Sequence, residues 1–149
     1  GRHNKVYDAP RELMAAAGGQ LTEMPRHGER SMCCGAGGAR MWMEEQIGKR
    51  INIDRVDEAL DTLASAKGAS GNGASGSIGE APQKIATGCP FCRVMLTDGV
   101  TARTSGTENE GKIEVVDVWH TDGMRATGSN DVVIADELGD HRTDQRQPA

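Results

Sequence analysis

The chain has 149 residues, enough for one domain of ordinary size, and only 36% of them are hydrophobic. Its formal net charge is −5 with both signs mixed along the sequence, so nothing resembles the basic patch of a nucleic-acid-binding protein. No apolar run approaches the roughly 18 residues of a membrane span, and the opening GRHNKVYDAP lacks the apolar core of a secretory signal. We therefore expect a cytoplasmic protein without a membrane span.

The first third of the chain predicts a helix, a strand and a second helix. Residues 8–17 (DAPRELMAAA) predict a short helix that begins at Asp8 and ends before two glycines. QLTEMPR, residues 20–26, predicts a short strand. ARMWMEEQIG, residues 39–48, predicts a helix. Its large apolar residues are expected in the core: Met41, Trp42 and Met43.

The helix expected next covers residues 53–67, with Asn52 or Asp54 as its cap. Its apolar residues recur at helical spacing and should share one buried face: Ile53, Val56, Leu60 and Leu63. Residues 68–81 are rich in Gly and Ser and predict a flexible loop.

The second half predicts two strands around another helix. QKIATG (83–88) and KIEVVDV (112–118) are plausible strands, and RVMLTDGV (93–100) starts a helix after the turn CPFC. From Thr121 the pattern decays, so we expect a cysteine-rich domain over 1–120 and a disordered tail over 121–149. Strands alternating with helices predict an α/β fold with a small parallel sheet flanked by helices. About three strands are visible, a thin sheet that favours a partner domain or subunit.

All four cysteines fall into two tight pairs, Cys33-Cys34 and Cys89-x-x-Cys92. Without a secretory signal, such pairs favour metal or redox chemistry over disulfides. Each pair is expected just before a helix, where unpaired backbone N–H groups stabilise negative charge such as thiolate sulfur. Three glycines follow the first pair and allow a close-approaching backbone to donate N–H···S bonds to a cluster: Gly35, Gly37 and Gly38.

Other interpretations of the cysteines stay open at this point. Four thiolates would satisfy tetrahedral zinc, although adjacent cysteines lack the spacing of typical zinc knuckles. GCPFC between a strand and a helix looks like a glutaredoxin active site with Cys89 as nucleophile, but no proline-led strand follows it. Arg26 and Arg30 either balance the negative charge of a cluster or bind an anionic substrate, or they form a solvated charged face.

The segments SMCCGAGGARMWMEE and ATGCPFCRVMLTDGV together resemble the cysteine-rich CCG domain. That domain occurs in the heterodisulfide reductase B subunit and in iron–sulfur subunits of lactate-, glycolate- and glycerol-3-phosphate-oxidising systems. The resemblance extends to the C-terminal part of large actinobacterial iron–sulfur-binding reductases. It covers about residues 1–120 apart from the Gly/Ser insert.

The resemblance implies a cluster site and a redox activity. The family pattern is an upstream Cys, a Cys-Cys-Gly pair and a Cys-x-x-Cys pair. The last four positions match Cys33, Cys34, Cys89 and Cys92, which would ligate a [4Fe–4S] cluster, with zinc as the alternative. The upstream Cys would precede Gly1, so a five-thiolate cluster would need a residue outside this sequence, whereas a four-thiolate cubane would not.

The expected function is therefore that of an iron–sulfur oxidoreductase domain. It would pass electrons between a substrate, either a disulfide or a 2-hydroxy-acid system, and other redox centres. Its expected partners are other iron–sulfur or flavin subunits or domains, which could hold it at the inner face of a membrane. The alternatives are a non-catalytic zinc-binding module, a thiol–disulfide protein using Cys89-x-x-Cys92, and a truncated remnant that folds poorly alone.

Overall fold

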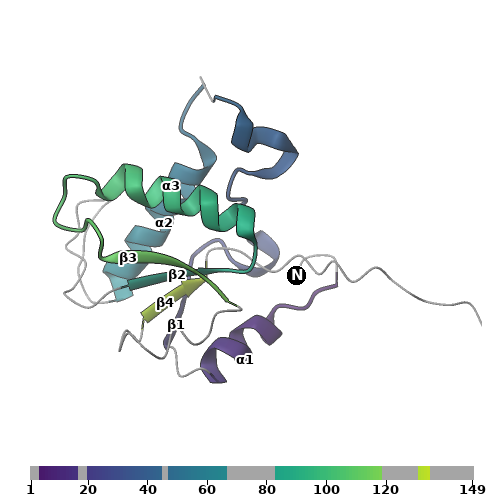
Figure 1. Ribbon diagram of the computed structural model, residues 1–149. Helices are drawn as coiled ribbons and strands as arrows, with labels where there is room; N and C mark the ends of the chain where they lie inside the picture. Colours follow the sequence, from purple (N-terminus) through teal and green to yellow (C-terminus); the bar gives the residue numbers. More distant parts are fainter. Residues whose placement is uncertain (1–3, 17–19, 45–46, 67–82, 119–130, 135–149) are drawn as a thin grey trace, which may run out of the picture.

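A computed structural model describes residues 4–16, 20–44, 47–66, 83–118 and 131–134 (Figure 1). Its three α-helices are α1 (Asp8–Ala16), α2 (Ile51–Ala66) and α3 (Pro90–Thr104). Its four strands are β1 (Gln20–Glu23), β2 (Gln83–Thr87), β3 (Ile113–Asp117) and β4 (Asp131–Ile134). Two short 3-10 segments, Gly28–Arg30 and Gly37–Trp42, lie between β1 and α2.

The four strands form one sheet in the order β1-β4-β2-β3, and every pair of neighbours is parallel. Strand β2 pairs with β3 from Gln83–Ile113 to Thr87–Asp117 and with β4 from Lys84–Val132 to Ala86–Ile134. All carboxyl ends therefore meet at one edge of the sheet. In open parallel sheets this edge is where ligands bind.

Helices cover both faces of the sheet: α2 and α3 lie on one face and α1 on the other (Figure 1). The larger core packs between α2, α3 and the sheet, where Leu63 and Leu96 meet Ile85 and Val115. The smaller core packs under α1. Its members are Met14, Ala86, Val116 and Val118, with Leu21 half-buried beside them. Alternate residues of β2 and β3 thus face opposite cores, as the pleat of a strand requires.

The predicted α/β fold with a small parallel sheet flanked by helices is confirmed. Helices α1 and α2 and strands β1, β2 and β3 all lie where the sequence predicts them, within a few residues. Helix α2 begins two residues early, at Ile51, so Asn52 and Asp54 lie inside it rather than capping it. Asn52 is instead fully buried, and its amide donates to the Met95 carbonyl of α3 at 3.1 Å.

The helix predicted over residues 39–48 is wrong in its described part. Residues 37–42 form 3-10 turns interrupted by a kink, because Gly38 and Ala39 have φ of 65° and 63°, and the chain leaves the helical region at Met43. The predicted burial of the large apolar residues of this segment is also wrong for two of the three. Met41 packs partly against the core, but Trp42 and Met43 are 81% and 60% exposed. Without a continuous helix, the apolar residues do not share a face that could pack inward.

The disordered tail predicted over 121–149 contains a strand in the structure. Residues 131–134 form β4, which lies between β1 and β2. The sequence prediction missed it because DVVI is only four residues long and follows a polar, Gly-containing stretch. The predicted Gly/Ser loop over 68–81, the predicted helix end at Gly18–Gly19 and the rest of the predicted tail lie outside the described residues.

Candidate cysteine-lined redox site

All four cysteines line a single cavity of about 460 Å³. The loop that follows β1 supplies Cys33 and Cys34, and the junction of β2 with α3 supplies Cys89 and Cys92. Both contributions come from segments that follow carboxyl ends of strands, so the parallel sheet brings together two motifs that are distant in sequence. None of the four forms a disulfide.

The adjacent pair points in two directions. Cys34 is 3% exposed and belongs to the larger core, whereas Cys33 is exposed. Gly35 follows the cysteine pair directly and turns the chain there. Its φ is +90°, and its N–H donates to the Cys33 Sγ at 3.3 Å. One of the three glycines therefore donates a backbone N–H to a cysteine sulfur, while the predicted N–H···S bonds to a cluster stay a prediction.

The second pair lies at the start of α3 and repeats this division. Cys89 is extended, caps the helix from the N-terminal side and is half-buried, while Cys92 in the first turn is buried in the core. Pro90 occupies the first helical position, where its missing N–H costs no hydrogen bond. The cavity thus has two thiols anchored in the core, Cys34 and Cys92, and two on its outer side.

The rest of the lining is uncharged. The residues beside the four cysteines are Ala36, Gly37, Ala39, Met41, Trp42 and Phe91. Of the three predicted cofactor-binding glycines, only Gly37 is on the lining. Gly35 is not on the lining but donates its N–H to the Cys33 sulfur. Gly38 is not on the lining either and forms part of the kink in the 3-10 segment. Phe91 and Trp42 were missed by the sequence analysis, although each lies next to a motif cysteine or the glycine run.

The arrangement suits a thiolate-ligated cofactor. Four thiols share a cavity whose remaining lining carries no charged side chain. Cysteine thiolates are the ligands of iron–sulfur clusters and also of structural zinc. The donor set therefore fits a metal cofactor held by cysteine.

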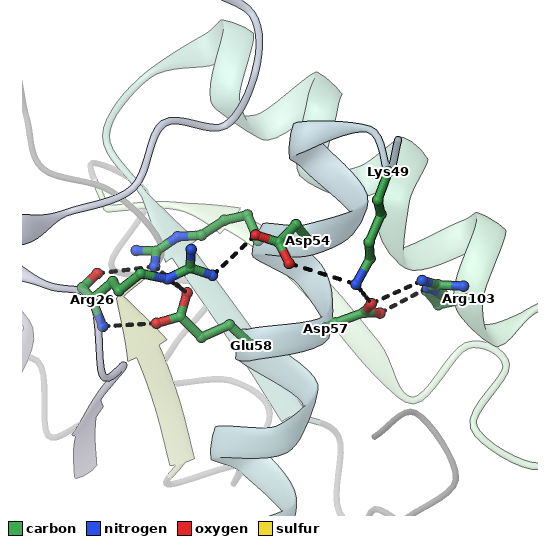
Figure 2. Close-up of polar contacts among 7 residues, drawn as sticks. Arg26, Lys49, Asp54, Asp57, Glu58 and Arg103 are labelled. Atoms are coloured by element: carbon green, nitrogen blue, oxygen red, sulfur yellow. Dashed lines mark hydrogen bonds and ion pairs between the residues drawn. The ribbon is translucent and has the colours of Figure 1, made fainter. Parts of the chain in front are cut away.

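Arg26 does not reach this cavity, contrary to one of the two roles considered for it. Its guanidinium binds Glu58 at 2.8 Å and Asp54 at 3.2 Å, both on α2 (Figure 2). Its backbone carbonyl accepts a bond of 2.9 Å from Arg55, a side chain only 1% exposed. Arg30 is exposed in the 3-10 segment. The network instead fixes the loop after β1 to α2.

The same network continues to α3 (Figure 2). Lys49 pairs with Asp54 and Asp57, and Asp57 accepts two bonds from Arg103 of α3, at 2.7 and 2.8 Å. These groups line a second cavity of about 870 Å³. The chain of charges joins the segment before α2, α2 itself and α3, which are the elements that carry or flank the cysteine loops. No sequence pattern indicated this network, since its partners come from four separate segments.

Two groups of the network have shifted pKa values. Burial by itself would raise the pKa of Asp57, but hydrogen bonds from Arg103 and Lys49 and their charges lower it. Burial would likewise lower the pKa of Arg26, but the hydrogen bonds and charges of Glu58 and Asp54 raise it. Both shifts favour the charged forms of these two groups.

A family model for a cysteine-rich domain, CCG, matches residues 1–97, which include both cysteine pairs. The chain belongs to the CCG cysteine-rich domain family. This confirms the resemblance drawn from the two motifs. No solved structure matches the chain at a significant level. No helix among the described residues is both long and apolar enough to cross a membrane.

Relatives of this CCG domain are iron–sulfur and electron-transfer proteins. A probable iron–sulfur-binding oxidoreductase of Bacillus subtilis, FadF, is 43% identical over 119 residues, which are 79% of this chain and 14% of FadF. The EtfAB:quinone oxidoreductase of Syntrophomonas wolfei is 41% identical, with the same shares covered. One subunit of the dihydromethanophenazine:CoB–CoM heterodisulfide reductase of Methanosarcina barkeri is 32% identical over 78% of this chain and 24% of its own length. The chain thus spans about a seventh of the first two relatives.

Proposed function

We propose that this CCG domain is an electron-transfer domain of an iron–sulfur oxidoreductase, and that Cys33, Cys34, Cys89 and Cys92 ligate a [4Fe–4S] cluster. The observation that carries the proposal is the convergence of both cysteine pairs on one uncharged cavity. The names of the relatives support the class of activity, since they include iron–sulfur-binding and quinone oxidoreductases.

When bound, a cluster supplies one-electron redox chemistry in the cavity. The chain's own residues hold and tune it. Cys34 and Cys92 anchor the site because their side chains are fixed in the core. The N–H of Gly35 already donates to the Cys33 sulfur, and such bonds stabilise thiolate charge. Gly37 keeps the lining free of side-chain bulk. The apolar walls lower the local dielectric around the buried thiols of Cys34 and Cys92.

The domain would exchange electrons with other iron–sulfur or flavin domains. The substrate of the whole system would be a disulfide or a 2-hydroxy acid, and the relative in Methanosarcina barkeri is named for a heterodisulfide. We place the protein in the cytoplasm, where thiols stay reduced, with attachment to the inner membrane face through partners as a further option.

Metal content tests the proposal directly. Anaerobic expression with iron and sulfide should give about four irons and four sulfides per chain, with an EPR signal in one redox state. Single substitutions of Cys34→Ser and Cys92→Ser should abolish the signal. Ser31→Ala, a change in the same loop outside the cavity lining, should preserve it. About one zinc and no iron would overturn the proposal in favour of a structural zinc module.

A second function is favoured by one observation. Cys89 is half-buried before α3 while Cys92 is buried within its first turn, the arrangement of a thiol–disulfide exchange site with an accessible nucleophile. In that case iron would be absent, and a reversible disulfide between Cys89 and Cys92 would form on oxidation. Mass spectrometry after alkylation would detect it.

A further inference from the structure

We propose that the hydroxyl of Thr87 donates a hydrogen bond to the ligating sulfur of Cys89 and so raises the reduction potential of the bound cluster. This inference deepens the proposed iron–sulfur function and rests on it. Thr87 acts through Cys89, so it is a positioning residue and not a ligand. Three observations carry the proposal: a buried hydroxyl without a partner, the side of β2 on which it lies, and its place just before Cys89.

Thr87 is the last residue of β2 and is fully buried. Its backbone carbonyl accepts a bond of 3.0 Å from the Val118 N–H, but its hydroxyl has no hydrogen-bond partner within the described part of the chain. The same part of the chain leaves the buried Asn52 Oδ1 without a partner, but an amide oxygen can only accept. A buried hydroxyl that bonds nothing lowers stability, so Thr87 offers a donor that still needs an acceptor.

The Thr87 side chain lies on the side of the sheet that α2 and α3 cover (Figure 1). Side chains alternate along a strand, and Ile85, two residues earlier, belongs to the larger core together with Cys34 and Cys92. Ala86 belongs to the smaller core under α1. Thr87 therefore faces the larger core, whose side chains carry sulfur as their only polar atom. Among these sulfurs a cysteine thiolate is the strong acceptor, since a thioether accepts only weakly.

Cys89 is the cysteine nearest to Thr87 in the chain and packs against the same core. Residues two apart in an extended segment point to one side with their Cα atoms about 7 Å apart, and the bend at Gly88 shortens this separation. Cys89 is itself extended, with φ of −128° and ψ of 128°. Side-chain rotation can therefore bring the Thr87 hydroxyl within hydrogen-bond distance of the Cys89 sulfur.

A donor to Cys89 repeats what the first cysteine pair already shows. Cys33 and Cys89 are the two outer thiols of the cavity, and the Cys33 Sγ accepts the Gly35 N–H at 3.3 Å. Reduction adds one electron, and part of that negative charge falls on the ligating sulfurs. A hydrogen bond to such a sulfur stabilises the reduced form more than the oxidised form and raises the potential.

The experiment compares three variants of the iron-loaded chain. Thr87→Val removes the hydroxyl and keeps a β-branched shape that suits a strand. Thr87→Ser keeps the hydroxyl and should behave like the wild type. Thr104→Val is the matched control, because Thr104 is also buried but its hydroxyl already donates to the Val100 carbonyl at 2.9 Å, at the other end of α3 from Cys92. Iron content and circular dichroism confirm that each variant is loaded and folded.

The first measurement is the midpoint potential, from a titration followed by EPR. Dithionite, which is oxidised to sulfite, supplies one electron per cluster through redox mediators. At the wild-type midpoint, Thr87→Val should have a reduced-to-oxidised ratio lower by about tenfold, which is a shift of about 59 mV for one electron. Thr87→Ser and Thr104→Val should stay within about twofold of the wild-type ratio.

The second measurement detects the hydrogen bond itself. In protein exchanged into D₂O, the deuteron of a hydroxyl bonded to a ligating sulfur gives a hyperfine coupling in the ENDOR spectrum of the paramagnetic cluster. This coupling should be present in the wild type, Thr87→Ser and Thr104→Val, and absent from Thr87→Val. A purely structural role of Thr87 would leave this coupling unchanged.

Three results would overturn the role of Thr87 while leaving the iron–sulfur function intact. One is a Thr87→Val potential equal to that of Thr104→Val. Another is a Thr87→Ser potential as low as that of Thr87→Val. The third is a deuteron coupling that persists in Thr87→Val. A wild-type chain that binds no iron would instead overturn the proposed function, and the role of Thr87 with it.

Discussion

At the scale of single residues, Gly35 combines a backbone requirement with a packing requirement. Its φ of +90° is a conformation that residues with a side chain rarely adopt. A Cβ added there would lie 3.1 Å from the Ile51 Cβ, at the start of α2. The same residue donates to the Cys33 sulfur. One glycine therefore sets both the turn after the cysteine pair and its distance from α2.

We expect Gly35→Ala to destabilise the domain by about 1–3 kcal/mol, because it adds left-handed strain and a contact with Ile51. Urea unfolding of the protein would measure the loss. Gly37→Ala is the matched control two residues later, since open space surrounds its added Cβ and its φ is not in the left-handed region. Equal losses in the two variants would contradict this account of Gly35.

At the scale of elements, the site depends on how α2 and α3 are joined. The two helices touch through Gly99, where an added Cβ would lie 2.8 Å from the Val56 Cγ2. An ionic contact also joins them, because Asp57 of α2 accepts two bonds from Arg103 of α3. Cys92 is carried by α3, and α2 is tied to the loop that precedes Cys33 through Glu58 and Arg26. The close crossing and the ion pairs thus fix the two cysteine pairs relative to each other.

Gly99→Ala should destabilise the domain by about 1–3 kcal/mol despite the higher helix propensity of alanine, because the close crossing must open. Combining it with Val56→Ala should recover part of that loss, since the shorter side chain makes room. A double-mutant cycle by chemical unfolding measures the coupling between the two positions. If the stability losses of Gly99→Ala and Val56→Ala simply add, the close crossing of the helices is not the cause of the Gly99→Ala loss.

The lowered pKa of Asp57 predicts how the stability of the domain depends on pH. Its pKa in the folded protein lies below its ordinary value, so its contribution to stability is fully present above about pH 4 and is lost as the pH falls through the folded pKa. Asp57→Asn should therefore cost about 1–2 kcal/mol at pH 7 and progressively less below pH 4. Unfolding measured from pH 3 to 7 would show the two curves converging.

The control for this pH series is Glu29→Gln, an exposed carboxylate of the 3-10 segment outside the network. It should leave the stability curve nearly parallel to that of the wild type. A constant difference between Asp57→Asn and the wild type across the whole pH range would contradict the assignment of the pH dependence to Asp57.

At the scale of the whole molecule, β4 completes the sheet. It pairs with β1 on one side and with β2 on the other, so it joins the strand that leads to Cys33 and Cys34 to the strand that leads to Cys89. In the described sheet β1 and β2 are not neighbours. The geometry of the cysteine cavity therefore depends on a strand close to the end of the sequence.

A chain ending at residue 120, the domain boundary predicted from the sequence, should lose its cooperative thermal transition and its thiol site. Without β4, the backbone groups of β1 and β2 have no ladder partner between them. A chain ending at residue 139 keeps β4 and should melt like the full chain. Circular dichroism during heating compares the two. A cooperative melt of the shorter chain would refute the structural role of β4.

The sequence by itself determined the features that are encoded locally. β-Branched runs marked β2 and β3, helical spacing of apolar residues marked α2, and the two cysteine pairs with their glycines marked the site and the family. These signals need only neighbouring residues, because strand and helix periods repeat within a few positions. The family resemblance implied one shared site for the four cysteines, and the parallel sheet of the structure brings both pairs to one cavity.

Only the tertiary structure decided the place of β4, the path of residues 37–44 and the ion network. A four-residue strand has too little pattern to stand out, and it forms because two partner strands lie on either side of it. Trp42 looked like a core residue, but the kink at Gly38 and Ala39 turned it outward. The place of β4 and the ion network depend on contacts between residues far apart in the chain, and local patterns carry no information about such contacts.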